Sequence, residues 1–373
     1  MIEAFALAAS SALPALLRGA LRRAPPSWPW IVSAPLLYAL IALAGFALRR
    51  AGVTTALYPG GNDDRGFMTL AALAVHGFGV ALPALGLALG AWHLRAGSRR
   101  LGAVIFALSL ASLGAALYAL AIEPATLVVR EERVHAARAP AGGVIILHVS
   151  DLQTDGPCRR ERLAVEAASR ELPDFVIFTG DLTNGLGPDD DAEARALAAN
   201  TFLRGLRARY AVLAVYGDWD AWGPTWPAWE RRILEGTNAV MLYNRALTYD
   251  LPGGRVVIWG AGGGGPTPTT IVRDMRDFDG LRILAGHHPD VLADGLTEGG
   301  ADLVLAGHTH GGQVVLPFFG ALVTHSERGF VGGRYAVKGV PFLVSRGIGM
   351  RGGAAPRVRF RCPPEITWVR VSR

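Results

Sequence analysis

The sequence has little cysteine, and its positive charge does not gather into a basic run. Cys158 and Cys362 cannot form a disulfide framework, and they do not fix the compartment. The formal net charge of +6 comes from arginines spread along the chain, so we expect attraction to anionic lipid headgroups and no nucleic-acid partner. Residues Gly260–Gly265, followed by Pro266 and Pro268, lack the strand–GxxxxGK–helix context of a phosphate-binding loop, and we interpret them as a mobile rim.

Long apolar runs are abundant, and they lie in the first 122 residues. Hydrophobic residues make up 51% of the chain, and the excess precedes residue 123. Ile31–Leu48, Phe67–Leu94 and Leu101–Ile122 are almost free of charge, and each is long enough to cross about 30 Å of hydrocarbon as a helix. The shorter run Ile2–Leu17 predicts either a fourth span or an interfacial helix. Residues 1–122 therefore predict an α-helical transmembrane region of three or four helices, in a multi-pass cell-membrane protein whose partner is the lipid bilayer. The alternative is a buried helical bundle.

The arginines beside these runs bear on orientation. One side of the predicted membrane carries six of them, Arg18, Arg22, Arg23, Arg95, Arg99 and Arg100. The side of the carboxyl-terminal region carries Arg49, Arg50 and Arg65, and the tally becomes equal when Arg130, Arg133 and Arg138 after the last span are added. Because cytoplasmic loops are enriched in arginine and lysine, the loop counts alone favour a carboxyl-terminal region outside the cytoplasm.

Five strand-like apolar runs follow residue 122, and each is succeeded by an aspartate or a histidine. They are Val144–Ser150, Phe175–Thr179, Ala211–Tyr216, Leu281–Ala285 and Leu303–Ala306. Helical stretches lie between them, at Arg160–Leu172, Ala192–Leu206 and Pro289–Leu296. This alternation predicts an α/β domain over residues 123–373. In such folds the ligands collect at the carboxyl ends of the strands, so the polar side chains are expected to converge.

Gly307-His308-Thr309-His310-Gly311-Gly312-Gln313 is the most informative of these strand ends. Two imidazoles one residue apart between glycines suit a metal site, although alone they also fit a turn with two surface histidines. The other strand ends are Asp151-Leu152-Gln153, Gly180-Asp181-Leu182-Thr183-Asn184, Gly217-Asp218-Trp219-Asp220 and Gly286-His287-His288. Carboxylate oxygens and imidazole nitrogens together suit two divalent cations. We expect His148, inside a strand, to be a packed and hydrogen-bonded histidine.

The order of these motifs resembles that of the calcineurin-like metallophosphoesterases, whose pattern is DxH, GDxxN, GNHD, a later His, and GHxH. The stretches GHTHGGQ-VVLP, SRGIG after Val344 and RCPPEI also resemble the membrane-linked bacterial branch. The resemblance runs from about Glu123 to the carboxyl terminus. It implies two packed mixed β-sheets flanked by helices, which would be preceded here by the transmembrane region.

The resemblance also implies a ligand set. One metal would be held by Asp151, Gln153, Asp181 and His310, and a second by Asp181, Asp218, His287 and His308. Of these, Asp181, Asp218, His287 and His308 would be the catalytic residues. His288 falls on the variable position beside the ligand histidine, and we expect it to line the wall.

Two positions depart from the family pattern. Gln153 replaces the histidine of DxH and offers a harder oxygen ligand, which favours Mn²⁺ or Mg²⁺, with Zn²⁺ and iron as alternatives. Asp218 and Trp219 replace the asparagine and histidine of GNHD. The anionic Asp218 still suits a metal, whereas the indole of Trp219 cannot protonate a leaving group.

These residues predict a membrane-anchored, metal-dependent phosphohydrolase with two divalent metal ions. It would cleave a phosphodiester or pyrophosphate bond in a small-molecule or lipid substrate, such as a lipid-linked or nucleotide-diphosphate compound. The alternative is a catalytically degenerate protein of the same family that acts as a binding or scaffold module, which Gln153 and Trp219 favour. The sequence does not name the oligomeric state.

Four tryptophans, Trp219, Trp222, Trp226 and Trp229, are spaced like one face of a short helix. They predict either core packing or an apolar rim that faces the bilayer, because amphipathic indoles favour interfaces.

Overall fold

A computed structural model describes residues 77–185, 192–220, 226–262, 275–296, 300–351 and 357–373. The predicted helical runs Ile2–Leu17 and Ile31–Leu48, and the first part of Phe67–Leu94, lie outside these residues. Two compact units are present, Met1–Ala116 with Ala354–Pro356, and Leu117–Gly353 with Arg357–Arg373. Each unit is described by itself.

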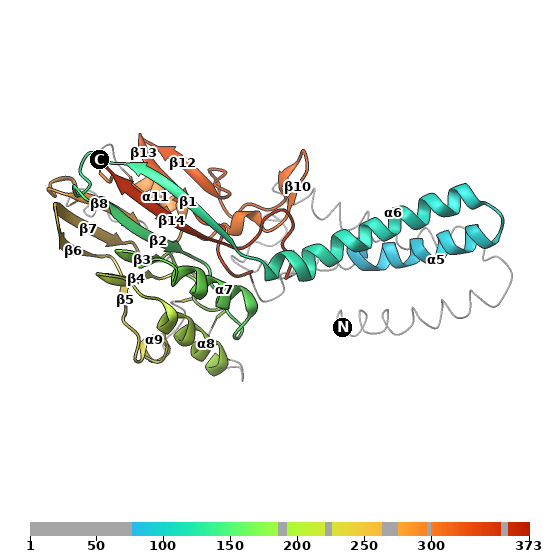
Figure 1. Cartoon of the computed structure of the whole chain (residues 1–373), viewed down its shortest axis with the longest axis horizontal. Helices are drawn as coiled ribbons and strands as arrows, with labels where there is room; N and C mark the ends of the chain where they lie inside the picture. Colours follow the sequence, from blue (N-terminus) through green and yellow to red (C-terminus); the bar gives the residue numbers. More distant parts are fainter. Residues whose placement is uncertain (1–76, 186–191, 221–225, 263–274, 297–299, 352–356) are drawn as a thin grey trace, which may run out of the picture. The chain divides into compact units, whose positions relative to one another are not determined.

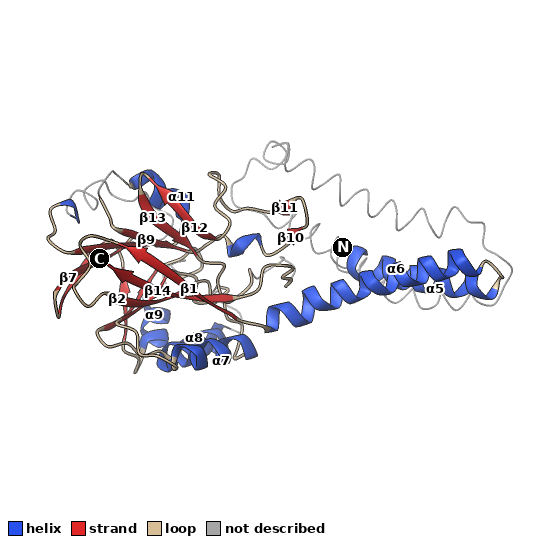
Figure 2. Cartoon of the chain, turned by 45° about the horizontal axis from the view of Figure 1, so that its top comes forward, coloured by secondary structure: helices blue, strands red, loops and turns tan. Residues whose placement is uncertain are grey.

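In the described part of the first unit, two apolar helices are joined by a short turn. A π-helix, η1 (Gly77–Ala81), leads into α5 (Leu82–Arg95), and α6 (Arg99–Leu117) follows after three residues. The two helices run side by side in Figures 1 and 2. Small residues permit this contact, because a Cβ on Gly102 would lie 2.7 Å from the backbone nitrogen of Leu94, and one on Gly90 would lie 2.8 Å from that of Phe106.

The second helix is the one described segment that is long and apolar enough to span a bilayer. It runs from Arg99 to Ala125 with a mean hydropathy of 2.1 over its 18-residue window, of which 11% is buried. Its last turns are a π-helix, η2 (Tyr118–Ile122), and a 3₁₀ helix, η3 (Glu123–Ala125). A single such helix is weak evidence for a membrane, since core helices and signal sequences share its length and composition.

The second unit is built on two six-stranded mixed sheets, drawn in Figure 1. In the first sheet the order is β1 (Val128–His135), β14 (Glu365–Ser372), β2 (Val144–Val149), β3 (Phe175–Phe178), β4 (Ala211–Val215) and β5 (Ala239–Leu242). In the second it is β12 (Gly333–Val337), β13 (Val340–Val344), β9 (Leu303–Ala306), β8 (Leu281–Ala285), β7 (Gly254–Gly260) and β6 (Arg245–Leu251). Strands β2, β3, β4 and β5 are parallel neighbours, as are β7, β8, β9 and β13.

The alternation of side chains along the strands creates three apolar layers. Ile146 of β2 and Ile283 of β8 point into the core between the sheets, where Phe175 and Leu305 also lie. Their sequence neighbour Leu147 packs on the opposite side of the first sheet. The outer cores hold the helices against the sheets, because a helix must bury its apolar face.

Helices cover both outer faces, as Figure 2 shows. On the first sheet lie α7 (Arg159–Ala168), α8 (Ala192–Gly205) and α9 (Trp226–Leu234), and on the second lies α11 (Pro289–Gly295). All five predicted strands and the three predicted helices are confirmed to within a few residues. The other nine described strands were not predicted from the sequence. They include β1 and β14, which pair in parallel along their whole length. The prediction of two packed mixed sheets flanked by helices is therefore confirmed for this unit.

Candidate metal centre

The seven predicted ligands all follow the carboxyl ends of parallel strands. Asp151 and Gln153 follow β2, Asp181 follows β3 and Asp218 follows β4. In the other sheet His287 follows β8, and His308 and His310 follow β9. Backbone bonds tie these ends together, since Asp151 N donates to Gly180 O at 2.9 Å and Gly307 N to His287 O at 3.0 Å. The site is thus assembled from both sheets at one edge.

Left-handed backbone marks the ligand positions. Five of the seven predicted ligands, Asp151, Gln153, Asp181, His308 and His310, have φ between 39° and 70°. Non-glycine residues rarely adopt this conformation, which costs free energy and persists where the surrounding structure enforces it, typically at functional sites. The strand ends therefore turn sharply to direct these side chains towards one another.

Two glycines allow the close approach of the ligands. A Cβ on Gly217 would lie 2.1 Å from Asp181 Oδ1, and one on Gly180 would lie 2.7 Å from His287 Nδ1. Any larger residue would displace the loop after β3 or the histidine after β8. The glycine that precedes each acidic motif is therefore required by space at the site.

The first group of converging atoms comes from Asp151, Asp181 and His287, all buried, whose ligand atoms lie within 4.8 Å of one another. His287 Nε2 lies 3.3 Å from Asp181 Oδ2, and His310 Nε2 lies 3.4 Å from Asp151 Oδ1. The orientation of His287 is set by Thr179, whose backbone oxygen lies 2.8 Å from Nδ1. This carboxylate and imidazole set fits one divalent cation.

A second group joins the first through His287 and includes Asp218, His288 and His308. His308 Nδ1 lies 3.2 Å from Asp218 Oδ2 and 3.2 Å from His287 Nε2. The expectation for His288 is corrected here. Its Nε2 lies 2.6 Å from Asp218 Oδ1, so it belongs to the cluster and does not merely line the wall.

Two buried atoms of the site have no hydrogen-bond partner among the described residues, Gln153 Oε1 and His310 Nδ1. A buried acceptor without a partner is costly, and a cation would satisfy it. Gln153 Nε2 donates to Asp181 Oδ2 at 2.8 Å, so a rotation of the amide would bring its oxygen to the same carboxylate. These orphaned atoms and the donor set fit a pair of divalent metal ions.

The electrostatics of the site favour neutral imidazoles at His308 and His310 and a charged carboxylate at Asp218. Burial lowers the pKa of His308 to about 4, and it also holds the pKa of His310 well below its ordinary value. Burial alone would raise the pKa of Asp218, but the hydrogen bonds from His288 and His308 outweigh it and lower that pKa. Neutral imidazole is the form that binds a metal.

Carboxylates crowd the first group. Burial raises the pKa of Asp151 to about 7, and the Asp181 carboxylate adds to that rise. Burial would lower the pKa of His287, but attraction to Asp181 dominates and raises it. In the metal-free protein His287 therefore carries a proton that a cation would displace.

Asp220 is a residue whose role the sequence analysis missed. Its fully buried carboxylate accepts three backbone N–H groups, from Asp181 at 2.7 Å, Leu182 at 2.8 Å and Gly217 at 2.9 Å. It fixes the two loops that carry Asp181 and Asp218. The only sequence signal was its position in the motif Gly217-Asp218-Trp219-Asp220, of which the sequence analysis interpreted only Asp218 and Trp219.

Other polar groups surround the site. The ring of His325 lies 5.8 Å from that of His308, and Arg351 Nη1 lies 3.1 Å from His325 Nε2. The backbone nitrogen of Arg351 also donates to Gln313 Oε1 at 2.8 Å, which ties it to the glycine-rich motif. Trp219 contributes its backbone, since its N–H donates to Asp181 Oδ1 at 3.0 Å.

The remaining predictions have mixed outcomes. His148 is confirmed as a packed histidine, because its buried Nε2 lies 2.9 Å from Thr179 Oγ1. Trp229 packs against the outer core between the first sheet and its helices. Trp222 and the side chain of Trp226 lie outside the described residues. Most of Gly260–Gly265 also lies outside them.

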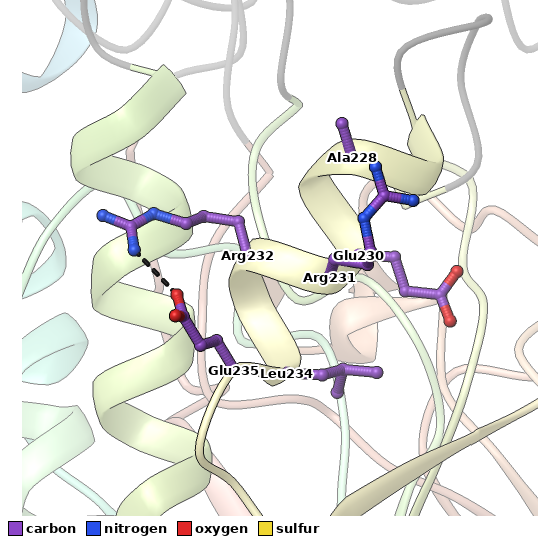
Figure 3. A pocket seen from close by; sticks show the side chains of 6 residues that line it. All are labelled: Ala228, Glu230, Arg231, Arg232, Leu234 and Glu235. Atoms are coloured by element: carbon purple, nitrogen blue, oxygen red, sulfur yellow. Dashed lines mark hydrogen bonds and ion pairs between the residues drawn. The ribbon is translucent and has the colours of Figure 1, made fainter.

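A hollow along α9 is distinct from the strand-end cluster. Figure 3 shows its six lining residues, Ala228, Glu230, Arg231, Arg232, Leu234 and Glu235. Arg232 forms ion pairs with Glu235 and with Glu193. None of the lining residues is among the predicted ligands.

Comparison with known proteins supports the expectation drawn from the motifs. Residues 144–312 match the family model described as calcineurin-like phosphoesterase. The chain is 28% identical over 264 residues to the uncharacterised metallophosphoesterase YkuE of Bacillus subtilis (strain 168), an alignment that covers 67% of this chain and 87% of the relative. An uncharacterised metallophosphoesterase of Aquifex aeolicus (strain VF5) is 27% identical over 266 residues, 67% of this chain and 94% of the relative.

Among solved structures, TT1561 of Thermus thermophilus aligns with 55% of this chain and 90% of its own, at 14% identity and a TM-score of 0.37. The family model and the names of the relatives support the calcineurin-like metallophosphoesterase family for this chain. The family and the aspartate and histidine cluster together indicate a divalent metal site.

Proposed function

We propose that the protein is a metal-dependent phosphohydrolase that cleaves a phosphodiester or pyrophosphate bond at the strand-end cluster. The observation that supports this most is the convergence of Asp151, Asp181, Asp218, His287 and His308 on two adjoining points that share His287. Asp181 belongs to the first group, and its carboxylate contacts the shared His287, Gln153 and the backbone of Trp219, which follows Asp218. We assign it the bridging role.

Asp151, Gln153, Asp181 and His310 would hold one cation, and Asp181, Asp218, His287 and His308 the other, with His288 beside Asp218. When bound, such a pair of cations activates water and neutralises charge on phosphoryl oxygens. The oxygen-rich donor set favours Mn²⁺ or Mg²⁺. Arg351 and His325 lie beside His308, and we assign them to contact with the substrate phosphate.

Trp219 restricts the leaving group. Its indole replaces the side chain that would donate a proton, and an alkoxide of high pKa leaves slowly without one. We therefore propose a substrate whose leaving group is already a stable anion, such as a phosphate released from a pyrophosphate bond. A lipid-linked or nucleotide-diphosphate compound meets this condition.

The test uses the full chain purified in detergent, with Mn²⁺ and bis-p-nitrophenyl phosphate. We expect Asp181→Asn to lower the rate by at least 100-fold, because it removes the bridging carboxylate. The matched control is Asp250→Asn, whose side chain is 87% exposed and which should retain the parent rate. Equal rates for the parent and the Asp181 variant would overturn the enzymatic proposal.

The same experiment addresses the alternative, a degenerate binding or scaffold protein. Gln153 and Trp219 are the two departures that favour it. A protein that binds two equivalents of Mn²⁺ by calorimetry and yet hydrolyses no phosphodiester or pyrophosphate would support this alternative.

We also propose that the protein is anchored in the cell membrane through its amino-terminal region, with the second unit outside the cytoplasm. Large apolar side chains on α6, including Val104, Leu108 and Leu110, are 55–68% exposed. The glycine contacts between α5 and α6 are typical of helices that pack in lipid. Resistance to extraction with alkaline carbonate tests the anchoring, and alkaline phosphatase fused after Arg373 tests the side.

A further inference from the structure

Two adjacent phenylalanines stand at the tip of the hairpin formed by β10 (Val315–Leu316) and β11 (Gly320–Ala321). Phe318 is 105% exposed and Phe319 is 74% exposed, the highest values among the large hydrophobic residues of the described chain. Phe318 also has a left-handed backbone, with φ of 68°. Figures 1 and 2 show the hairpin apart from both six-stranded sheets. Large aromatic side chains presented in this way favour an apolar or interfacial environment.

The base of this hairpin and the last turns of the candidate membrane helix both contact the segment Arg359–Phe360. Val315 N donates to Phe360 O at 2.9 Å, and Arg359 N donates to Ala119 O at 3.0 Å. The rings of Phe360 and Tyr118 meet edge to face with centroids 6.5 Å apart. Phe318 lies three positions after Val315, a reach of about 11 Å in an extended chain. The hairpin tip therefore lies close to the point where the apolar helix ends.

The ten residues Val314–Val323 include no charged side chain. Tyr118 and Ile122 on the last turns of the helix are themselves 42% and 50% exposed. An uncharged hairpin with an aromatic tip, linked through Arg359 and Phe360 to the end of an apolar helix, matches the composition of segments that enter a lipid interface. A charged or polar rim, which a protein partner would contact, is absent from these ten residues.

We propose that Phe318 and Phe319 insert into the membrane interface and form a second membrane contact besides the amino-terminal helices. This inference rests on the proposed membrane anchoring and adds to it. The hairpin begins directly after the motif that carries His308 and His310, and a Cβ on Gly312 would lie 2.6 Å from the Cβ of Ala321. Insertion of the tip would therefore hold the His310 side of the metal centre near the lipid surface, where an amphiphilic phosphate substrate resides.

The experiment places a fluorophore at the tip of the full chain. In a Cys158→Ser background, Phe318→Cys is labelled with a nitrobenzoxadiazole probe, and the protein is reconstituted into phosphatidylcholine and phosphatidylglycerol vesicles. Cys362 is buried and contacts His310, so the unsubstituted Cys158→Ser protein shows the background labelling. Leu172→Cys, at a surface leucine that is 49% exposed, is the matched control. Thermal unfolding close to that of the parent confirms that each labelled protein is folded.

We expect blue-shifted emission from the label at position 318, and at least twofold quenching when the lipids carry a nitroxide on the acyl chain. The label at position 172 should show neither change. Equal quenching at the two positions, or none at 318 in protein that floats with the vesicles, would overturn the inference and leave the anchoring intact. A blue shift without quenching would mean that a second copy or another protein covers the tip, which also contradicts the inference. Protein that does not float with the vesicles would contradict the anchoring itself.

Discussion

Replacing Asp220 with asparagine tests whether the loops of the metal centre are held by one buried carboxylate. The carboxylate accepts backbone N–H groups from Asp181, Leu182 and Gly217, two at Oδ2 and one at Oδ1. Asparagine has one acceptor oxygen. In its best orientation it keeps the bonds at the Oδ2 position and turns its own NH₂ group towards the N–H of Leu182.

The expected loss follows from these three contacts. An unsatisfied buried N–H costs about 1–3 kcal/mol, and each of the other two bonds weakens by about 1 kcal/mol when its acceptor loses its charge. Relief of the repulsion between Asp220 and Asp181 offsets part of this, since that repulsion and burial raise the pKa of Asp220 to about 7. We expect a net loss of about 3 kcal/mol, which in a unit of about 250 residues lowers Tm by about 6–12 °C.

The assay is thermal unfolding of the full chain in detergent, followed by circular dichroism with EDTA present, so that metal binding does not contribute. Asp250→Asn is the control, because its side chain is 87% exposed and its loss should cost less than about 0.5 kcal/mol. A Tm for Asp220→Asn within 2 °C of this control would refute the reasoning. Mn²⁺ affinity measured on the same proteins should fall for Asp220→Asn alone.

Three further predictions concern single residues. Gln153→His replaces an oxygen ligand with nitrogen and should shift the metal preference towards Zn²⁺ in titrations, whereas an unchanged ranking would contradict the ligand role of Gln153. In a series of aryl phosphodiesters, the rate of the parent should fall steeply as the pKa of the leaving group rises, and Trp219→His should make this dependence shallower. A flat dependence in the parent would mean that another acid, such as His288 or His325, donates the proton. Burial lowers the pKa of His148 to about 3, so the folded state excludes a proton that the unfolded state binds below pH 6.5. The free energy of unfolding should therefore fall by about 2–3 kcal/mol between pH 7 and pH 4.5 because of this residue. Denaturation with EDTA present should show a smaller loss for His148→Gln, and identical pH profiles for the two proteins would contradict this.

The central strands could be predicted from the sequence because they are buried on both faces. β3 and β9 are short apolar runs between helical stretches, and glycine and polar residues end them sharply. β1 could not be found in this way, since four consecutive charged residues interrupt the apolar side chains of Val128–His135, and most of its residues are exposed. Its place depends on parallel pairing with β14, more than two hundred residues later in the chain, and local patterns carry no such information.

The sequence placed the proposed ligand residues after strands, and the structure agrees on these positions, but the neighbours of these residues could not be predicted. Asp218 and His288 are 70 residues apart and meet at 2.6 Å, a contact that depends on the packing of the two sheets. The sequence analysis gave no role to Asp220, whose oxygens accept hydrogen bonds from backbone N–H groups of both loops. His325 and Arg351 lie outside the strand-end motifs, and only the fold places the ring of His325 5.8 Å from that of His308 and Arg351 against His325.

The contact between Asp218 and His288 affects the charge balance of the site. Asp218 places a charge where the family pattern has a neutral asparagine, and it thereby raises the negative charge of a cluster that already holds Asp151 and Asp181. An N–H of His288 offsets part of this cost, because it donates to Asp218 Oδ1, and His308 contributes a second contact to Oδ2. The remaining charge has no compensating lysine or arginine in contact with these carboxylates among the described residues, and burial raises the pKa of Asp151 to about 7. Attraction to these carboxylates raises the pKa of His287, whose proton balances part of the charge, and a cation that displaces this proton would take over that role. We therefore infer that Asp218 and His288 act together, and that bound divalent metal would complete the charge balance of the site.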